Sequence, residues 1–168
     1  MMINRLAIYA CMLSAICTFT AQAASNNTNL SVSVSVPPQV IVNSGQINFG
    51  VSTNPTTTLT ASGTFQVTVS AGYAYHITLD AGLHAVTMRR MAASTGFFRP
   101  YELYQDAAFA RTWGDAAFAG SYSSGSPLAA TGTGIAQTFT VYAASQGQAS
   151  AAEPLGNYTD IVTITIHY

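Results

Sequence analysis

The chain has 168 residues, of which 49% are hydrophobic and only 7% are charged, and its net charge at pH 7 is −1. Binding to nucleic acid or to an anionic membrane surface needs clustered basic side chains, so this composition excludes both kinds of partner. A surface with so few charges repels other copies weakly, and it is tolerable mainly where self-association is intended or controlled.

Residues 1–23 have the pattern of an export signal. Arg5 supplies a positive charge, an apolar run extends from Leu6 to about Phe19, and Ala21 to Ala23 give a small-x-small cleavage pattern. The apolar run is shorter than the roughly 20 residues that a membrane-spanning helix requires. The sequence therefore predicts cleavage after Ala23 and no membrane insertion of the exported chain.

Both cysteines, Cys11 and Cys17, lie within this signal. Removal of the signal leaves one domain-sized chain with no thiol and no disulfide. A lipid anchor on Cys17 is the alternative interpretation. Against it, the bulky Ile16 stands directly before the cysteine instead of three residues before it.

The segment from Leu30 to Val36 reads LSVSVSV and alternates strictly between apolar and polar residues. A strand here would place four aliphatic side chains on one face: Leu30, Val32, Val34 and Val36. Pro37 and Pro38 follow and remove two backbone donors. The segment is either the first strand of the chain's own sheet or a strand that another molecule receives, because alternation shows only that one face becomes buried.

Further short alternating segments, separated by turns rich in Gly, Pro, Asn and Ser, predict an all-β fold. The middle of the chain, residues 88–128, is expected to be irregular. Strands at this spacing favour a two-sheet sandwich of the immunoglobulin-like kind. The expected strands are two short ones within residues 40–50, then 64–70, 74–82, 137–143 and 160–168.

Residue types that support catalysis or metal binding are sparse. His76, His84 and His167 lie in or beside expected strands, and no H-x-x-x-H pattern, acidic cluster or G-x-S-x-G motif is present. The sequence therefore predicts no catalytic residues, no metal and no cofactor.

Two groups in the irregular middle segment allow other interpretations. Tyr101, Tyr104 and Trp113 could form a platform for a sugar, although buried aromatic packing is more common. Arg89 and Arg90, together with Asp106 and Asp115, are expected to form a local set of ion pairs or hydrogen bonds.

Six motifs, in this order along almost all of the chain, resemble the spore coat protein U domain. They are INFG at 47–50, ITLDAG at 77–82, MRRM at 88–91, YELYQD at 101–106, WGD at 113–115 and GNYTDIVTITIHY at 156–168. In Gram-negative bacteria this domain forms the pilins of archaic chaperone–usher pili, which build a surface fibre and support adhesion and biofilm formation.

The resemblance implies an incomplete immunoglobulin-like sandwich that lacks its final strand. A periplasmic chaperone supplies the strand first, and the N-terminal extension of the next subunit supplies it later. Residues 24–37 would then be the donor-strand extension, whose aliphatic side chains enter the neighbour's groove, and residues 38–168 the pilin domain. The C-terminal strand would form core and also offer one face to the chaperone, through Val162, Ile164, Ile166 and Tyr168.

The partners implied are a periplasmic chaperone, an outer-membrane usher and other pilin subunits, in a homopolymer or a heteropolymer on the cell surface. The alternative is a self-contained secreted surface or coat module that binds a glycan or another ligand. One departure from the family is visible. Its usual two cysteines correspond here to Val40 or Ile41 and to a position near Val69, so aliphatic residues replace the disulfide.

Overall fold

The structure is a computed structural model, which describes residues 26–54, 56–118, 120–147 and 156–168. The expected export signal, residues 1–23, lies outside the described residues. The chain divides into two units, residues 1–35 and 36–168. In the first unit, residues 26–35 form no strand, and Leu30, Val32 and Val34 are 87%, 86% and 86% exposed.

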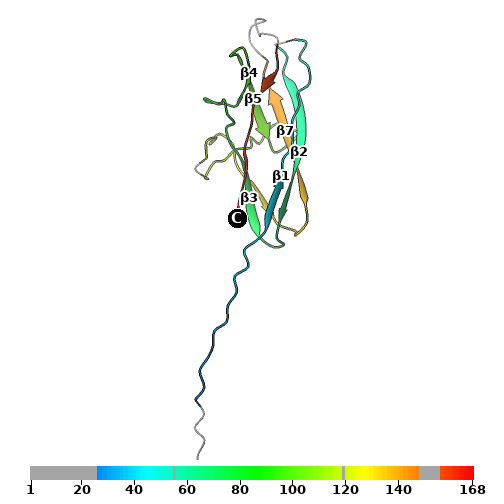
Figure 1. The fold of residues 1–168 in the computed structure, drawn as a ribbon. Helices are drawn as coiled ribbons and strands as arrows, with labels where there is room; N and C mark the ends of the chain where they lie inside the picture. Colours follow the sequence, from blue (N-terminus) through cyan, green and yellow to red (C-terminus); the bar gives the residue numbers. More distant parts are fainter. Residues whose placement is uncertain (1–25, 55, 119, 148–155) are drawn as a thin grey trace, which may run out of the picture. The chain divides into compact units, whose positions relative to one another are not determined.

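Two antiparallel sheets make up the second unit (Figure 1). The larger sheet has six strands in the order β1 (Val40–Asn43), β2 (Leu59–Val69), β7 (Gln137–Ser145), β5 (Phe98–Tyr104), β4 (Arg90–Ala93) and β8 (Tyr158–Thr159). The smaller sheet has the order β6 (Leu128–Thr131), β3 (Ala74–Leu79) and β9 (Ile164–His167). The described residues contain no helix.

The hydrophobic core comes from inward-facing residues of both sheets. In β2, every second side chain from Phe65 to Val69 is buried. In β3, the alternate side chains of Tyr75, Ile77 and Leu79 are buried. Alternation of this kind follows from the two-residue period of a strand. Trp113 is fully buried between these contributions, and its indole N–H donates a hydrogen bond of 2.9 Å to the carbonyl of Ile77. The expected all-β, immunoglobulin-like sandwich is confirmed.

A buried guanidinium joins the two sheets near the end of β3. Arg89 is fully buried, and its N–H groups donate to the carbonyls of Leu79, Asp80 and Trp113. Its remaining partner is Glu102 Oε1 in β5, at 2.7 Å. The guanidinium therefore donates hydrogen bonds to carbonyl oxygens and to one carboxylate. Without such partners a buried charge would be strongly unfavourable.

Two sequence expectations about the middle segment were wrong. Residues 88–128 contain β4 and β5, and β6 begins at their end. Neither Asp106 nor Asp115 pairs with Arg89: the Asp106 carboxylate accepts backbone N–H groups of its own loop, and Asp115 accepts from the N–H of Tyr122. Backbone hydrogen bonds, first that of Ala110, hold the pKa of Asp106 below its ordinary value.

Other expected strands are shorter than the alternation suggested. Residues 44–52 and 160–163 form no strand, so only 40–43 and 164–167 of those two regions belong to sheets. The segment 30–36 is likewise no strand in this chain. A strand needs a partner along its edge, and the described strands pair with none of these segments.

The pairing of β1 with β2 identifies which residue stands where the family's first cysteine is expected. Val40 lies opposite Val69, whereas Ile41 lies opposite Thr68 and is exposed. Val69 is fully buried and Val40 packs against the core. Directly opposed residues of an antiparallel pair have Cα atoms about 4.5–5.5 Å apart, which is within the range of a disulfide.

This register makes a prediction for the double variant Val40→Cys/Val69→Cys. In the exported protein the two cysteines should form a disulfide that raises the free energy of unfolding by about 3–4 kcal/mol, as expected for a closed loop of this length. Thermal unfolding with and without reductant measures the effect, and the single variant Val40→Cys is the control. Two free thiols after oxidation would contradict the register.

Candidate strand-binding groove

A groove of about 1040 Å³ opens into the core of the second unit. Two segments form its walls: residues 44–53 make the first wall, and residues 156–162 with Ile164 make the second. Core residues form the floor, among them Phe65, Leu79, Leu103 and Val141. The hydrophobic core is therefore reached from outside along this groove.

The backbone on both sides of the groove has capacity for hydrogen bonds. β9 is the edge strand of the smaller sheet and pairs only with β3, and β1 is the edge strand of the larger sheet. Among the described residues, the backbone of 44–53 makes no backbone–backbone hydrogen bond. An edge of this kind is a template for an added strand.

The first wall is held in place by packing and by two glycines. Ile47 and Phe49 pack against the core, and the Phe49 ring meets that of Tyr101 edge-on at 6.4 Å. A Cβ on Gly45 would lie 2.1 Å from the carbonyl oxygen of Thr64, and one on Gly63 would lie 2.2 Å from that of Gln46. Glycine is needed at both positions because the two backbones approach so closely.

Asp160 anchors the second wall. Its side chain is 3% exposed and accepts three hydrogen bonds: from the N–H of Leu83 and Nδ1 of His84 at 3.0 Å, and from the hydroxyl of Tyr101 at 2.7 Å. Burial, and then the bond to Asp160, raise the pKa of Tyr101 above its ordinary value, so this phenol stays protonated and remains a donor.

Asp80 and Gly82, from the ITLDAG motif, complete this anchor. Asp80 Oδ1 accepts hydrogen bonds from the N–H groups of Gly82 and Thr163, both at 2.9 Å. Gly82 has a φ of 77°, and a Cβ there would lie 2.2 Å from Asp160 Oδ2. Residues with a Cβ rarely adopt this φ. Glycine is therefore required at position 82 both by the backbone conformation and by the close approach of Asp160.

The residues expected to face a partner lie as follows. Val162, Ile164 and Ile166 pack against the core, and the first two also line the groove, whereas Tyr168 is 69% exposed. Val36, the last of the four aliphatic residues of the alternating segment, is 75% exposed.

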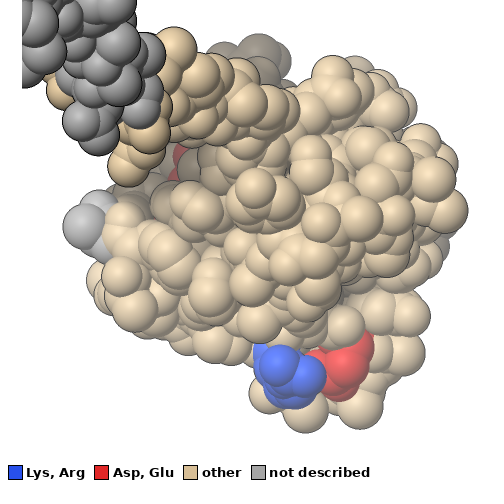
Figure 2. All heavy atoms as spheres, turned by 90° about the horizontal axis from the view of Figure 1, so that it is seen from below, with Lys and Arg blue, Asp and Glu red and all other residues tan. Residues whose placement is uncertain are grey.

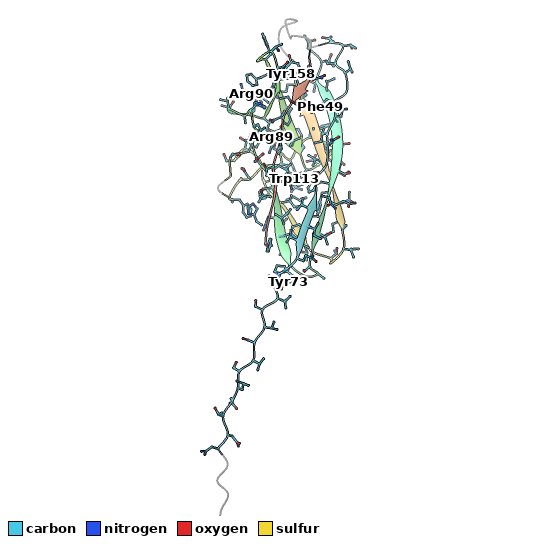
Figure 3. All side chains as sticks on the ribbon, in the orientation of Figure 1. Phe49, Tyr73, Arg89, Arg90, Trp113 and Tyr158 are labelled. Carbon is cyan, nitrogen blue, oxygen red and sulfur yellow. The ribbon has the colours of Figure 1, made fainter. Side chains whose placement is uncertain are left out.

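The three aromatic residues considered as a sugar platform do not share one open surface. Trp113 is fully buried, and Tyr101 lies in the floor of the groove with its hydroxyl bonded to Asp160. Tyr104 packs edge-on against Phe109 at 5.4 Å. In Figure 3, Phe49 and Tyr158 lie toward one end of the sandwich and Trp113 nearer its middle.

The described part of the chain was also searched for a metal site, a membrane-spanning helix and charged surface. It contains no group of three or more His, Cys, Asp or Glu side chains arranged to hold a metal ion. No described helix is long and apolar enough to cross a membrane. Almost all of the face in Figure 2 is uncharged, with a single basic patch beside an acidic one.

A family model described as the Spore Coat Protein U domain matches residues 9–165. The chain belongs to the Spore Coat Protein U domain family. No curated protein matches its sequence.

Among solved structures, the chain is similar to one in the crystal structure of the CsuC–CsuE chaperone–tip adhesion subunit pre-assembly complex from the archaic chaperone–usher Csu pili of Acinetobacter baumannii. The TM-score is 0.54 and the identity 19%, over 79% of this Spore Coat Protein U domain chain and 40% of that chain. The chain thus spans less than half of its structural neighbour, and the likeness is one of fold.

The anchor of the second wall makes a prediction for Asp160→Ala. The buried carboxylate and its three hydrogen bonds are lost, but the donors of Leu83 and His84 are partly exposed and can bond to water, so the free energy of unfolding should fall by about 2 kcal/mol, which lowers Tm by roughly 4–8 °C for a domain of this size. Thermal unfolding measures the change. Tyr101→Phe, which removes one of the three bonds, should cost about 1 kcal/mol; equal melting of Asp160→Ala and the wild type would refute the anchor.

Proposed function

We propose that this chain is a structural subunit of a chaperone–usher pilus and that its groove receives a strand from a neighbouring subunit. The observation that carries the proposal is the groove itself: an apolar floor lies beside residues 44–53, whose backbone makes no described backbone–backbone hydrogen bond, and beside β9, an edge strand that pairs only with β3. A bound strand would cover the floor with alternate side chains and pair along the walls, which is β-augmentation.

The segment 30–36 has the properties that such a groove requires. Fully extended, its seven residues span roughly 23 Å. Leu30, Val32, Val34 and Val36 would enter the groove of the next subunit, and the serines between them would face outward. Each aliphatic side chain contributes at most about 1.5–3 kcal/mol on full burial, in addition to the main-chain hydrogen bonds.

We assign the parts of the chain and its partners accordingly. Residues 1–23 act as the export signal, 24–37 as the donor-strand extension and 38–168 as the pilin domain. A periplasmic chaperone, bound along Val162, Ile164, Ile166 and Tyr168, would precede the next subunit, and an outer-membrane usher would export the fibre to the surface of a Gram-negative cell. Membership in the Spore Coat Protein U domain family and the fold shared with a pilus complex that includes a chaperone support this assignment.

The proposed role is structural and non-catalytic, in a fibre that supports adhesion and biofilm formation. The alternative, a self-contained surface module that binds a glycan or another ligand, would need a site independent of residues 24–37. The buried position of Trp113 removes one of the three aromatic rings on which that alternative was based. Two experiments separate these functions.

Two adjacent substitutions test the direction of the side chains in the extension. Val34→Asp would place a charge in the apolar groove and should abolish multimers that resist detergent without boiling. Ser33→Asp adds the same charge one residue away, on the outward face, and should leave the multimers intact. Gel electrophoresis of material sheared from cells reads both results, and equal behaviour of the two variants would refute the assignment of faces.

Deletion of residues 24–37 tests the role of the extension as a whole. If the chain is a fibre subunit, the deleted protein keeps its groove but has no strand to insert into the groove of a neighbour. The ladder of multimers, which should collapse on boiling in the wild type, should then vanish. A self-contained binding module should behave alike with and without the deletion. Monomer in every lane, wild type included, would contradict the pilin assignment.

A further inference from the structure

Four apolar side chains are exposed together at one end of the sandwich, beside the second wall of the groove. They are Leu83 after β3, Phe97 and Phe98 where β5 begins, and Ile161 before β9, with exposed fractions of 68%, 53%, 38% and 67%. Asp160, next to Ile161, accepts the N–H of Leu83, and it also bonds to His84, whose ring lies 6.1 Å from that of Phe98. These contacts join the four residues into one surface, which we call the apolar end patch.

Arg90 fixes the two loops of the apolar end patch against each other. Its guanidinium lies 4.2 Å from the centre of the Phe98 ring, and its Nε donates to the carbonyl of His84 at 2.8 Å. The loop after β3 and the start of β5 are therefore held together as one surface. Clustered apolar side chains exposed on a folded domain mark an interaction site.

A second group of apolar residues lies at the opposite end of the sandwich. Tyr73, in the turn before β3, and Ile135, in the loop before β7, are 46% and 71% exposed. The carbonyl of Tyr73 accepts the N–H of Gly132, which ties the two loops together. In Figure 3, Tyr73 lies at this end and Arg90 lies at the end that carries the apolar end patch. We call this second surface the Tyr73 end.

The free edge of β9 determines where a strand bound in the groove would finish. β9 ends at His167, which lies opposite His76, soon after Tyr73 in the chain. A strand that pairs antiparallel with β9, the more stable arrangement, would begin near the Tyr73 end and finish beside residues 160–161. Val36, the last residue of the proposed donor strand, would then leave the groove at the apolar end patch.

The connection between the donor strand and the body of its own subunit is very short. Residues 37–39 separate Val36 from β1, and three residues span at most about 10 Å. Gln39 is fastened to the turn that holds Tyr73: its N–H donates to Ser70 Oγ at 3.0 Å, and its carbonyl accepts the N–H of Ser70 at 3.2 Å. Insertion of the strand therefore brings the Tyr73 end of the incoming subunit to the apolar end patch.

We propose that the apolar end patch is a docking surface for the Tyr73 end of a second copy of this chain. The inference rests on the proposed function, because the strand in the groove brings the two ends together. The contact joins two different surfaces, so it is heterologous and repeats along an open fibre. Burial of both sets of apolar side chains favours the contact, and the contact in turn limits rotation of one subunit about the two prolines.

Cysteine cross-linking tests this contact, because the chain has no cysteine after Cys17. Multimers of Leu83→Cys/Ala71→Cys, sheared from cells and treated with a short bismaleimide, should keep their ladder after boiling in detergent. Mass spectrometry should find residue 83 of one copy joined to residue 71 of the next. Ser62→Cys/Ala71→Cys is the matched control, since Ser62 is exposed within β2 and belongs to neither end; its yield should be at least tenfold lower.

The outcomes of this experiment separate the contact from the proposed function. Equal yields from the two variants, with an intact ladder before boiling, would overturn the docking surface and leave the pilus function standing. Cross-links only to a protein of different sequence would overturn a second copy as the occupant. Absence of multimers before boiling would overturn the proposed function together with the inference that rests on it.

A charge in the apolar end patch tests what the contact does for the fibre. Phe97→Asp leaves the groove unchanged, because Phe97 does not line it, so multimers that resist detergent should persist. The persistence length of the fibres in electron micrographs should fall about twofold or more, since the subunits lose the contact that limits their rotation. Ser62→Asp adds the same charge on β2 and should change neither measurement. Unchanged persistence length in Phe97→Asp would overturn the inference.

Discussion

One buried guanidinium organises this sandwich. Arg89 contacts the end of β3 through the carbonyls of Leu79 and Asp80, and it contacts β5 through Glu102. The chain has no cysteine after Cys17, so no disulfide can fasten the two sheets. A buried charge costs several kcal/mol unless its hydrogen bonds are satisfied, and breaking such a set leaves an unpaired charge behind. The ring of Tyr122, 4.1 Å from the guanidinium carbon, and its hydroxyl, which donates to Glu102, complete the set.

The groove depends on this arrangement through a short series of contacts. Arg89 fixes the backbone at Asp80, and the Asp80 side chain holds Gly82 and Thr163. Gly82 in turn leaves room for Asp160, which holds the second wall. A network of polar groups thus keeps an apolar groove open, whereas apolar side chains alone would gain free energy by closing the groove. Five of the six motifs supply residues of this network, for example Asp80 of ITLDAG, Arg89 of MRRM and Glu102 of YELYQD.

The sequence was sufficient for the fold class and insufficient for much of the site. Alternation of apolar residues identifies β2, β3 and β7, because each buries one full face. It fails for β5, where the inward positions begin with Arg99 and a proline follows. Asp160 was not singled out either, since its partners Leu83, His84 and Tyr101 lie 59 to 77 residues away and only the tertiary structure brings them together. The sequence also suggested Asp106 and Asp115 as partners of Arg89 by proximity along the chain, whereas strand pairing supplies Glu102 instead.

The alternating segment and the groove are two apolar surfaces of the same molecule that are exposed to water. An exposed row of aliphatic side chains and an apolar groove that opens to solvent are both unfavourable in water, and a chain with few charges has little repulsion to prevent association. In the proposed fibre, binding of the segment in the groove of a neighbouring copy would remove both costs at once, whereas each would remain if copies stayed apart. Pro37 and Pro38 cannot donate to a sheet, so the connection between the segment and β1 resists incorporation into a continuous strand. In the proposed fibre, the apolar surfaces that would make a free subunit prone to aggregate would therefore supply the free energy of ordered assembly, because the strand would bind in one groove and in one register.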